Sequence, residues 1–202
     1  METNKNRMDR DFVPSSGLKI QFSDLYKSEN EIILILEKTN DSLYSIYVYN
    51  KTTDSLKISN QDWHLFLIQE AKNQNGQWQP IEFWKYSTCT NSYLSDQIEP
   101  SGIIKTQSKV YNGSFETQIR FKLLNDNKVY YSNSITGFIN LSQFDIPNDQ
   151  TEFRTYKRIE SRGGIKILKK IIFLEPNGWT EFIEKEDAYL EKMAELKQKN
   201  KN

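Results

Sequence analysis

The clearest hydrophobic pattern in the chain is an alternation between Ser114 and Leu124. Apolar residues or Thr occupy one set of alternate positions, and charged or amide residues occupy the other, which is typical of a strand with one face in a core. The first set is Phe115, Thr117, Ile119, Phe121 and Leu123, and the second is Glu116, Gln118, Arg120 and Lys122. A continuous apolar run from Ile32 to Leu36 is too short for a typical helix and predicts a fully buried strand.

Turn sequences separate the other short apolar segments. Asn75-Gly76 lies between the segments 63–68 and 78–84 and predicts a hairpin with a type I′ turn. The weak alternation from Leu18 to Phe22 predicts one more short strand. About seven or eight strands follow between Ile32 and Leu141, at the spacing of a sandwich or barrel, and an antiparallel two-sheet sandwich is the simplest solution.

The last quarter of the chain carries a different pattern. Segments 153–159 and 165–174 flank Gly163-Gly164 and predict a hairpin rich in basic residues. Thr180 is a candidate N-cap for a helix that ends near Lys199, with acidic residues near its start and lysines near its end. Its apolar stripe is Phe182, Tyr189, Met193 and Leu196, and either docking on its own domain or contact with a partner would bury it.

These patterns divide the chain into four parts and predict a mainly β fold with a C-terminal α-helix. The predicted parts are a flexible N-terminal arm (1–17), a β-sandwich domain (18–150), a basic β-hairpin extension (151–178) and a C-terminal helix (179–202).

Composition narrows the classes of partner. Lys and Arg number 27, as do Asp and Glu, so the formal net charge is zero and nucleic acid is an unfavoured partner. Cys89 is the single cysteine and His64 the single histidine, so neither a disulfide within the chain nor a usual zinc site is expected. No apolar run approaches the ~20 residues of a membrane span.

The first seventeen residues contain no apolar segment of the kind found in signal peptides. A cytoplasmic location is expected if Met1 is the native start, and an extracytoplasmic one if a signal was removed. The sequence alone leaves the location open.

Catalytic residues are hard to assemble from this chain. A Cys89–His64 pair lacks a surrounding nucleophile motif, and the Gly-rich pattern of a phosphate loop is missing. Glu70, Glu82 and Glu99 are the remaining carboxylate candidates for sugar hydrolysis. We therefore predict no enzyme activity, no cofactor and no metal site.

Two groups of residues are candidates for binding. Trp63, Trp78, Trp84 and Tyr86 cluster in sequence around the Asn75-Gly76 turn. Exposed rings would stack on sugars or anchor a partner protein, whereas buried rings would fill the core. The second group is a basic patch that would bind an anionic partner or else form a solvated surface; it consists of Arg154, Lys157, Arg158 and Arg162.

Several segments together resemble an uncharacterised family of bacterial proteins. They are 62–71, 75–84, 89–93, 113–120, 131–133, 137–140 and 143–144, so the resemblance covers roughly Leu43 to Phe144. The family pattern often has Gly where this chain has Thr90. The resemblance implies an immunoglobulin-like sandwich and makes export or lipid anchoring plausible, and it implies no activity.

The sequence therefore favours a non-enzymatic binding or structural module whose ligand is unknown. One alternative is a carbohydrate-binding or carbohydrate-active protein that uses exposed aromatic rings. Another is a protein-partner or assembly component that uses the C-terminal helix.

Overall fold

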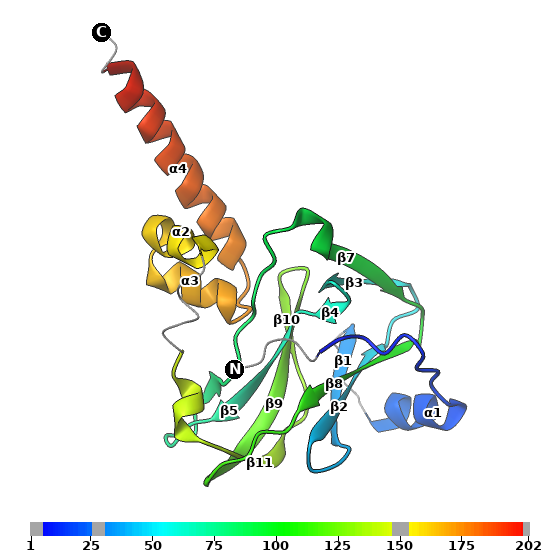
Figure 1. Ribbon diagram of the computed structural model, residues 1–202. Helices are drawn as coiled ribbons and strands as arrows, with labels where there is room; N and C mark the ends of the chain where they lie inside the picture. The colour runs from blue at the N-terminus through cyan, green and yellow to red at the C-terminus, as the bar shows by residue number, and fades with distance from the viewer. Residues whose placement is uncertain (1–5, 26–30, 147–153, 200–202) are drawn as a thin grey trace.

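The computed structural model describes residues 6–25, 31–146 and 154–199. Within these residues the fold is mainly β, with three antiparallel sheets and four α-helices, the last of them at the C-terminal end (Figure 1). The predicted fold class is confirmed at this level. None of the described helices is long and apolar enough to cross a membrane.

The first sheet is buried on both faces. It contains β1 (Ile32–Lys38), β2 (Leu43–Asn50) and β8 (Ile103–Lys109), in the order β1-β2-β8. Leu34 and Ile46 face the central core, whereas Ile33 and Tyr47 belong to a second cluster under the N-terminal helix. This double burial explains the uninterrupted apolar run and confirms that prediction.

The second sheet is a half-barrel built around the long strand β9. Its strands are β5 (Leu67–Lys72), β6 (Trp78–Pro80), β9 (Phe115–Asn125), β10 (Lys128–Tyr131) and β11 (Ile135–Ile139). Strand β5 pairs with one edge of β9, and β10 and β11 share the other edge. Ile119, Phe121 and Leu123 enter the core, as the alternation predicts.

The third sheet contains β4 (His64–Leu65), β3 (Leu56–Gln61) and β7 (Tyr93–Ile98), in the order β4-β3-β7. The predicted strand 63–68 is split between two sheets, because β4 pairs with β3 whereas β5 pairs with β9. Phe66 lies at this crossing, and its carbonyl oxygen accepts a 2.9 Å hydrogen bond from the Leu124 amide.

The hairpin at Asn75-Gly76 is present, but its turn differs from the prediction. Gly76 has a φ of 75°, whereas Asn75 is not among the described residues with positive φ. The Gly76 amide donates to the Asn73 carbonyl at 2.9 Å, and the Asn73 amide donates to the Gln77 carbonyl at 2.8 Å. This is a type I turn closed by a left-handed glycine, so the type I′ prediction is wrong.

A type I′ turn occurs instead between β9 and β10. Its two central residues, Asp126 and Asn127, have φ values of 48° and 59°. Asn and Asp tolerate this left-handed backbone better than other residues with side chains. Asn125 and Lys128 close the turn as a cross-strand pair.

The strand predicted for residues 18–22 is wrong, because the segment lies in helix α1 (Ser16–Leu25). The Ser15 hydroxyl oxygen accepts a hydrogen bond from the Leu18 amide at 3.1 Å, which caps the first turn. Leu18 and Phe22, four residues apart, then pack together on the β1-β2-β8 sheet. Two apolar residues at this spacing suit a helix as well as a strand.

The first described residues of the predicted flexible arm (1–17) are anchored to the sheets, contrary to the prediction for that part. The Met8 amide donates to the Trp63 carbonyl at 2.9 Å, and the Thr106 hydroxyl donates to the Arg7 carbonyl at 2.8 Å. Asn6 and Met8 are both buried. The segment therefore joins two sheets, while residues 1–5 of the predicted arm lie outside the described residues.

The basic hairpin predicted for residues 151–178 is wrong, because the described part is helical. Helices α2 (Arg154–Gly163) and α3 (Ile165–Ile172) meet at Gly164, whose φ is 82°. The buried positions of α3 are Ile167, Leu168, Ile171 and Ile172. This spacing follows a helical period, which the run of isoleucines conceals in the sequence. Residues 151–153 lie outside the described residues.

The C-terminal helix α4 (Gly178–Lys199) confirms the predicted element, although it begins before the proposed cap at Thr180. The Glu181 amide donates to the Asn177 carbonyl at 2.9 Å, so Thr180 already lies in the first turn. Phe182 packs on α2 and α3. The later turns project from the body of the protein, and Leu196 is exposed (Figure 1). We refer to α2, α3 and α4 together as the helical unit.

Candidate functional site

The helical unit is attached to the half-barrel through Trp84. The Trp84 amide donates to the Ile172 carbonyl at 2.7 Å, and the Tyr156 hydroxyl donates to the Trp84 carbonyl at 2.8 Å. Trp84 also packs with Ile68 of β5 and with Leu174, which follows α3. Leu174 is fully buried at a φ of 55°, so packing compensates for a backbone conformation that is uncommon for leucine.

A second attachment joins the tip of the β9–β10 hairpin to the start of α4. The Asn177 amide donates a 3.1 Å hydrogen bond to the Asn127 side-chain oxygen. Both residues have left-handed backbone conformations, with Asn177 at a φ of 61°. The hairpin tip and the first turn of α4 are thereby held at a fixed separation.

Four aromatic side chains from distant parts of the chain converge beside this attachment. Phe66 comes from the crossing between sheets, Tyr86 follows Trp84, Tyr93 opens β7 and Trp179 lies in the first turn of α4. The Tyr86 and Trp179 rings meet at 86° with centroids 4.9 Å apart. The Phe66 and Tyr86 rings are stacked at 29° with centroids 6.0 Å apart. The rings therefore form a corner.

A cavity of about 410 Å³, open to solvent, lies at this corner, and its volume is within the usual range for small-molecule sites. We call it the aromatic pocket. Its eight lining residues are Ser59, Phe66, Tyr86, Tyr93, Leu124, Asp126, Asn127 and Trp179. Most of its surface is apolar, and its one carboxylate comes from the type I′ turn.

The two tyrosine hydroxyl groups of the pocket are engaged by backbone carbonyls. Tyr93 donates to the Ser87 carbonyl at 2.7 Å, and Tyr86 donates to the Ile171 carbonyl at 3.4 Å. Burial raises the pKa of both phenols, and the Trp179 indole offsets part of this rise for Tyr86. The tyrosines therefore stay neutral at physiological pH and offer their rings rather than their hydroxyl groups to the cavity.

The four aromatic residues predicted to form a binding surface lie in different parts of the structure. Trp84 is buried at 1% exposure, and only Tyr86 lines the aromatic pocket. The Arg7 and Arg10 guanidinium carbons lie 5.4 and 5.7 Å from the ring centroid of Trp63. The Arg120 guanidinium carbon lies 4.2 Å from the ring centroid of Trp78. Trp63 and Trp78 are not lining residues of the cavity, and each lies beside cationic side chains.

The predicted basic patch lies on α2 instead of a hairpin. Arg158 and Arg162 contact the carboxylate of Glu186 on α4, at 2.5 and 3.1 Å. The Arg158 contact lowers the pKa of Glu186. Lys157 is exposed, and the Arg154 side chain lies outside the described part of the chain. Two of the four cations thus fasten α2 to α4.

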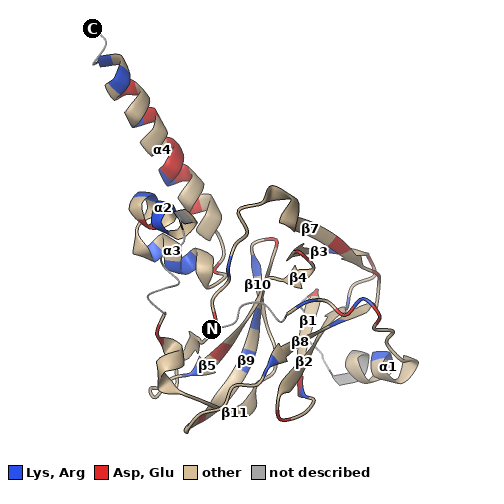
Figure 2. Cartoon of the chain, viewed as in Figure 1, with Lys and Arg blue, Asp and Glu red and all other residues tan. Residues whose placement is uncertain are grey.

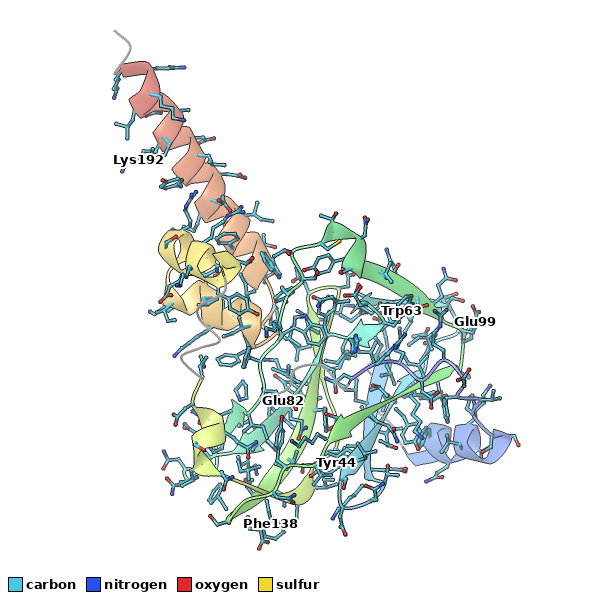
Figure 3. All side chains as sticks on the ribbon, in the orientation of Figure 1. Tyr44, Trp63, Glu82, Glu99, Phe138 and Lys192 are labelled. Carbon is cyan, nitrogen blue, oxygen red and sulfur yellow. The ribbon has the colours of Figure 1, made fainter. Side chains whose placement is uncertain are left out.

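The three candidate carboxylates each have their own partners and form no common site. Glu70 bonds Arg120 at 2.7 Å, and Glu99 accepts from the Ser55 hydroxyl at 2.8 Å. Glu82 accepts from the Gln69 amide at 2.9 Å. Figure 3 shows Glu82 and Glu99 far apart.

Cys89 and His64 are likewise separate. Cys89 is exposed just before the short 3₁₀ helix η1 (Thr90–Ser92). The Nδ1 atom of His64 lies 3.2 Å from the Gln61 carbonyl oxygen, and no hydrogen bond joins these two described side chains. Among residues 6–25, 31–146 and 154–199, no three His, Cys, Asp or Glu side chains gather as a set of metal ligands.

Glu82 gives a pH-dependent prediction. Burial raises its pKa above the ordinary value of 4.5, while Gln69 and Tyr111 donate hydrogen bonds that oppose the rise. A raised pKa means that the folded state binds the proton more tightly than the unfolded state does, so the protonated carboxyl favours folding. Stability from this group therefore increases as the pH falls through the folded pKa toward 4.5.

Glu82→Gln tests this expectation, because glutamine keeps the size of the side chain and cannot titrate. Urea unfolding at several values between about pH 8 and about pH 5 gives the free energy of each variant. Relative to Glu82→Gln, the wild type is expected to gain stability as the pH falls. A constant difference between the two variants contradicts this role of Glu82.

Sequence reasoning missed Phe66, Tyr93, Asp126 and Trp179 as members of one site. Asn125-Asp126-Asn127 is recognisable as a turn, but the sequence does not show that it lies against α4. Trp179 follows Asn177-Gly178, a signal that marks the start of the helix and nothing more. The pocket depends on contacts between residues far apart in the sequence, such as Asn127 and Asn177, which are 50 positions apart.

No family model matches the chain, and no curated protein matches it. The functional argument therefore depends on the geometry of the chain itself.

Proposed function

We propose that the protein is a non-enzymatic binding module whose aromatic pocket holds a small ligand. The observation that carries this proposal is the cavity of about 410 Å³ between the half-barrel and α4, lined by four aromatic rings and one carboxylate. The immunoglobulin-like sandwich and the bacterial family predicted from the sequence stay predictions, and the proposal does not depend on them.

The exposed aromatic surface supports binding. Tyr93 is 40% exposed, and Trp179 is partly exposed at the rim of a rigid corner. Covering apolar surface contributes about 25 cal/mol per Å², so a ligand stacked on two rings gains several kcal/mol before its own ordering cost. The corner is held by hydrogen bonds and packing at Trp84 and Asn127, so little further ordering of the protein is needed.

The lining chemistry suits recognition better than catalysis. Asp126 is the one carboxylate among the lining residues, and both tyrosine hydroxyls are engaged by carbonyl oxygens. General acid–base chemistry requires a group that exchanges a proton with the substrate, usually near neutral pKa. Ser59 has no adjacent base among the lining residues to activate it as a nucleophile.

Two alternative functions stay predictions. Carbohydrate binding is supported by the aromatic rings of the same pocket, because sugars stack on such rings. An assembly role for α4 is supported by the exposed apolar side chains of its projecting turns, which are Ile183, Tyr189, Leu190 and Leu196.

Filling the cavity tests the proposed function. Ser59→Phe adds a ring to the wall contributed by β3, and Ser134→Phe makes the same substitution in an exposed loop outside the pocket. With indole as a neutral aromatic probe, we expect Ser59→Phe to weaken binding at least about tenfold, a change of about 1.4 kcal/mol. Titration calorimetry measures both variants and the wild type.

Ser134→Phe is expected to bind indole as the wild type does. Equal affinity of the wild type and Ser59→Phe contradicts binding in the aromatic pocket, provided that circular dichroism shows both proteins folded.

A further inference from the structure

The aromatic pocket has an acidic lining residue and no basic one. Of its eight lining residues, Asp126 alone is charged at neutral pH, and none is Lys, Arg or His. The Asp126 carboxylate makes no hydrogen bond or salt bridge within the described residues. A carboxylate beside an apolar wall repels anionic ligands and favours cationic ones.

The basic residue nearest in sequence pairs mainly with another carboxylate, although its charge also acts on Asp126. Lys128, two positions after Asp126, has its Nζ atom 3.3 Å from a carboxylate oxygen of Glu31. Asp62 is not a lining residue, and its negative charge adds to the effect of burial in raising the pKa of the Tyr93 phenol. The lining residues therefore offer an anionic ligand no basic side chain to pair with.

The aromatic rings also favour a cationic ligand. The faces of Phe, Tyr and Trp rings are electron-rich, and a cation within about 6 Å of a ring centroid is attracted to them. Tyr86 and Trp179 meet at 86°, so a group at their corner contacts more than one aromatic side chain at once. Corners of this kind hold ammonium groups whose methyl or methylene substituents cover the rings.

The backbone that carries Asp126 is held in place before any ligand arrives. Its left-handed φ of 48° belongs to a two-residue turn, and its neighbour Asn127 accepts the hydrogen bond from Asn177. The exposed Asp126 side chain can therefore turn toward a ligand without rearrangement of the backbone, which favours affinity.

From these observations we infer that the aromatic pocket selects an organic ammonium ion with an apolar body. The ammonium group lies between Asp126 and the aromatic corner, and the apolar body covers Leu124 and Phe66. This inference rests on the proposed function, because it names the class of ligand for the same cavity.

Two probe molecules of equal shape allow the effect of ligand charge on affinity to be measured apart from the effect of ligand size. The 4-hydroxy-N,N,N-trimethylanilinium ion and 4-tert-butylphenol differ mainly in the replacement of a quaternary nitrogen by carbon. Each probe is titrated into the protein at mildly acidic pH, where both phenols are protonated, and binding is measured by calorimetry. We expect the cation to bind about tenfold more tightly than the neutral probe, since cation–π and ion-pair contacts together reach that magnitude.

Asp126→Asn is expected to reduce the affinity for the cation severalfold and to leave the affinity for 4-tert-butylphenol unchanged. Asp187→Asn removes an exposed carboxylate from α4, away from the cavity, and is expected to change neither affinity.

The outcomes separate the two proposals. Equal binding of both probes to the wild type, or an unchanged cation affinity in Asp126→Asn, overturns the ammonium inference and leaves the binding function standing. Failure of both probes to bind overturns the ammonium inference and counts against the binding function as well.

Discussion

Glu70→Gln is expected to destabilise the protein by about 3–5 kcal/mol, because it leaves buried cations without their shared carboxylate. The Glu70 side chain is 5% exposed and bonds the Arg120 guanidinium at 2.7 Å, while Lys122, at 1% exposure, lies 3.8 Å away. Figure 2 shows the acidic segment on β5 and basic segments on the neighbouring β9. Urea unfolding monitored by tryptophan fluorescence measures the loss.

Glu175→Gln is the matched control for this prediction. Glu175 also bonds Lys122, but its side chain is 43% exposed, so solvent screens the interaction. We expect a loss of about 1 kcal/mol or less from this substitution. A loss for Glu175→Gln as large as that for Glu70→Gln contradicts the account of the buried charge cluster.

Trp84→Ala is expected to cost about 3–5 kcal/mol and to loosen the helical unit from the half-barrel. Trp84 is 1% exposed, packs with Ile68 and Leu174, and lies 5.0 Å from the Phe66 ring. The substitution leaves a large cavity at the point where the two parts of the chain meet. Urea unfolding gives the free energy, and amide hydrogen exchange follows the release of α2 and α3.

Trp78→Ala tests whether the burial of Trp84 at this junction causes the loss of stability. Trp78 is only partly buried and stacks with Arg120 at the edge of the half-barrel. A smaller loss is expected, without faster exchange in the helical unit. The account is contradicted if Trp84→Ala leaves the exchange of α2 and α3 unchanged, or if both substitutions cost the same.

Sequence reasoning predicts well those strands in which burial sets a regular pattern of apolar and polar residues. Strand β9 alternates because one face enters the core, and β1 is continuously apolar because α1 and the core cover both faces. Lys122 is the exception on β9. Its position on the polar face predicts exposure, but Glu70 and Glu175 allow the ammonium group to be buried.

The helices that sequence reasoning misses are short, and α3 among them is rich in isoleucine. The residues of α3 read as a strand because isoleucine favours sheets and because Lys169-Lys170 interrupts the apolar run. Tertiary packing decides the outcome, since Ile167, Ile171 and Phe182 form one core with α2 and α4. A local preference for strand is overridden by this shared core.

The aromatic pocket was only partly accessible from the sequence. Tyr86 is recognisable as part of an aromatic cluster, but its neighbour Trp84 is enclosed while Tyr86 lines a cavity. That difference depends on where the helical unit docks, which no local pattern encodes. Asp126 is an ordinary turn residue in sequence and becomes significant only beside Trp179.

The central claim is that the aromatic pocket binds a small ligand, and the indole N–H signals of the four tryptophans test it most directly. Spectra of the ¹⁵N-labelled protein are recorded during titration with 4-hydroxy-N,N,N-trimethylanilinium, and Trp179→Phe assigns the signal from the pocket. The account predicts a saturable shift of the Trp179 signal, while the signals of Trp63 and Trp78 stay in place. A shift confined to Trp63 or Trp78, or no saturable shift at all, contradicts it.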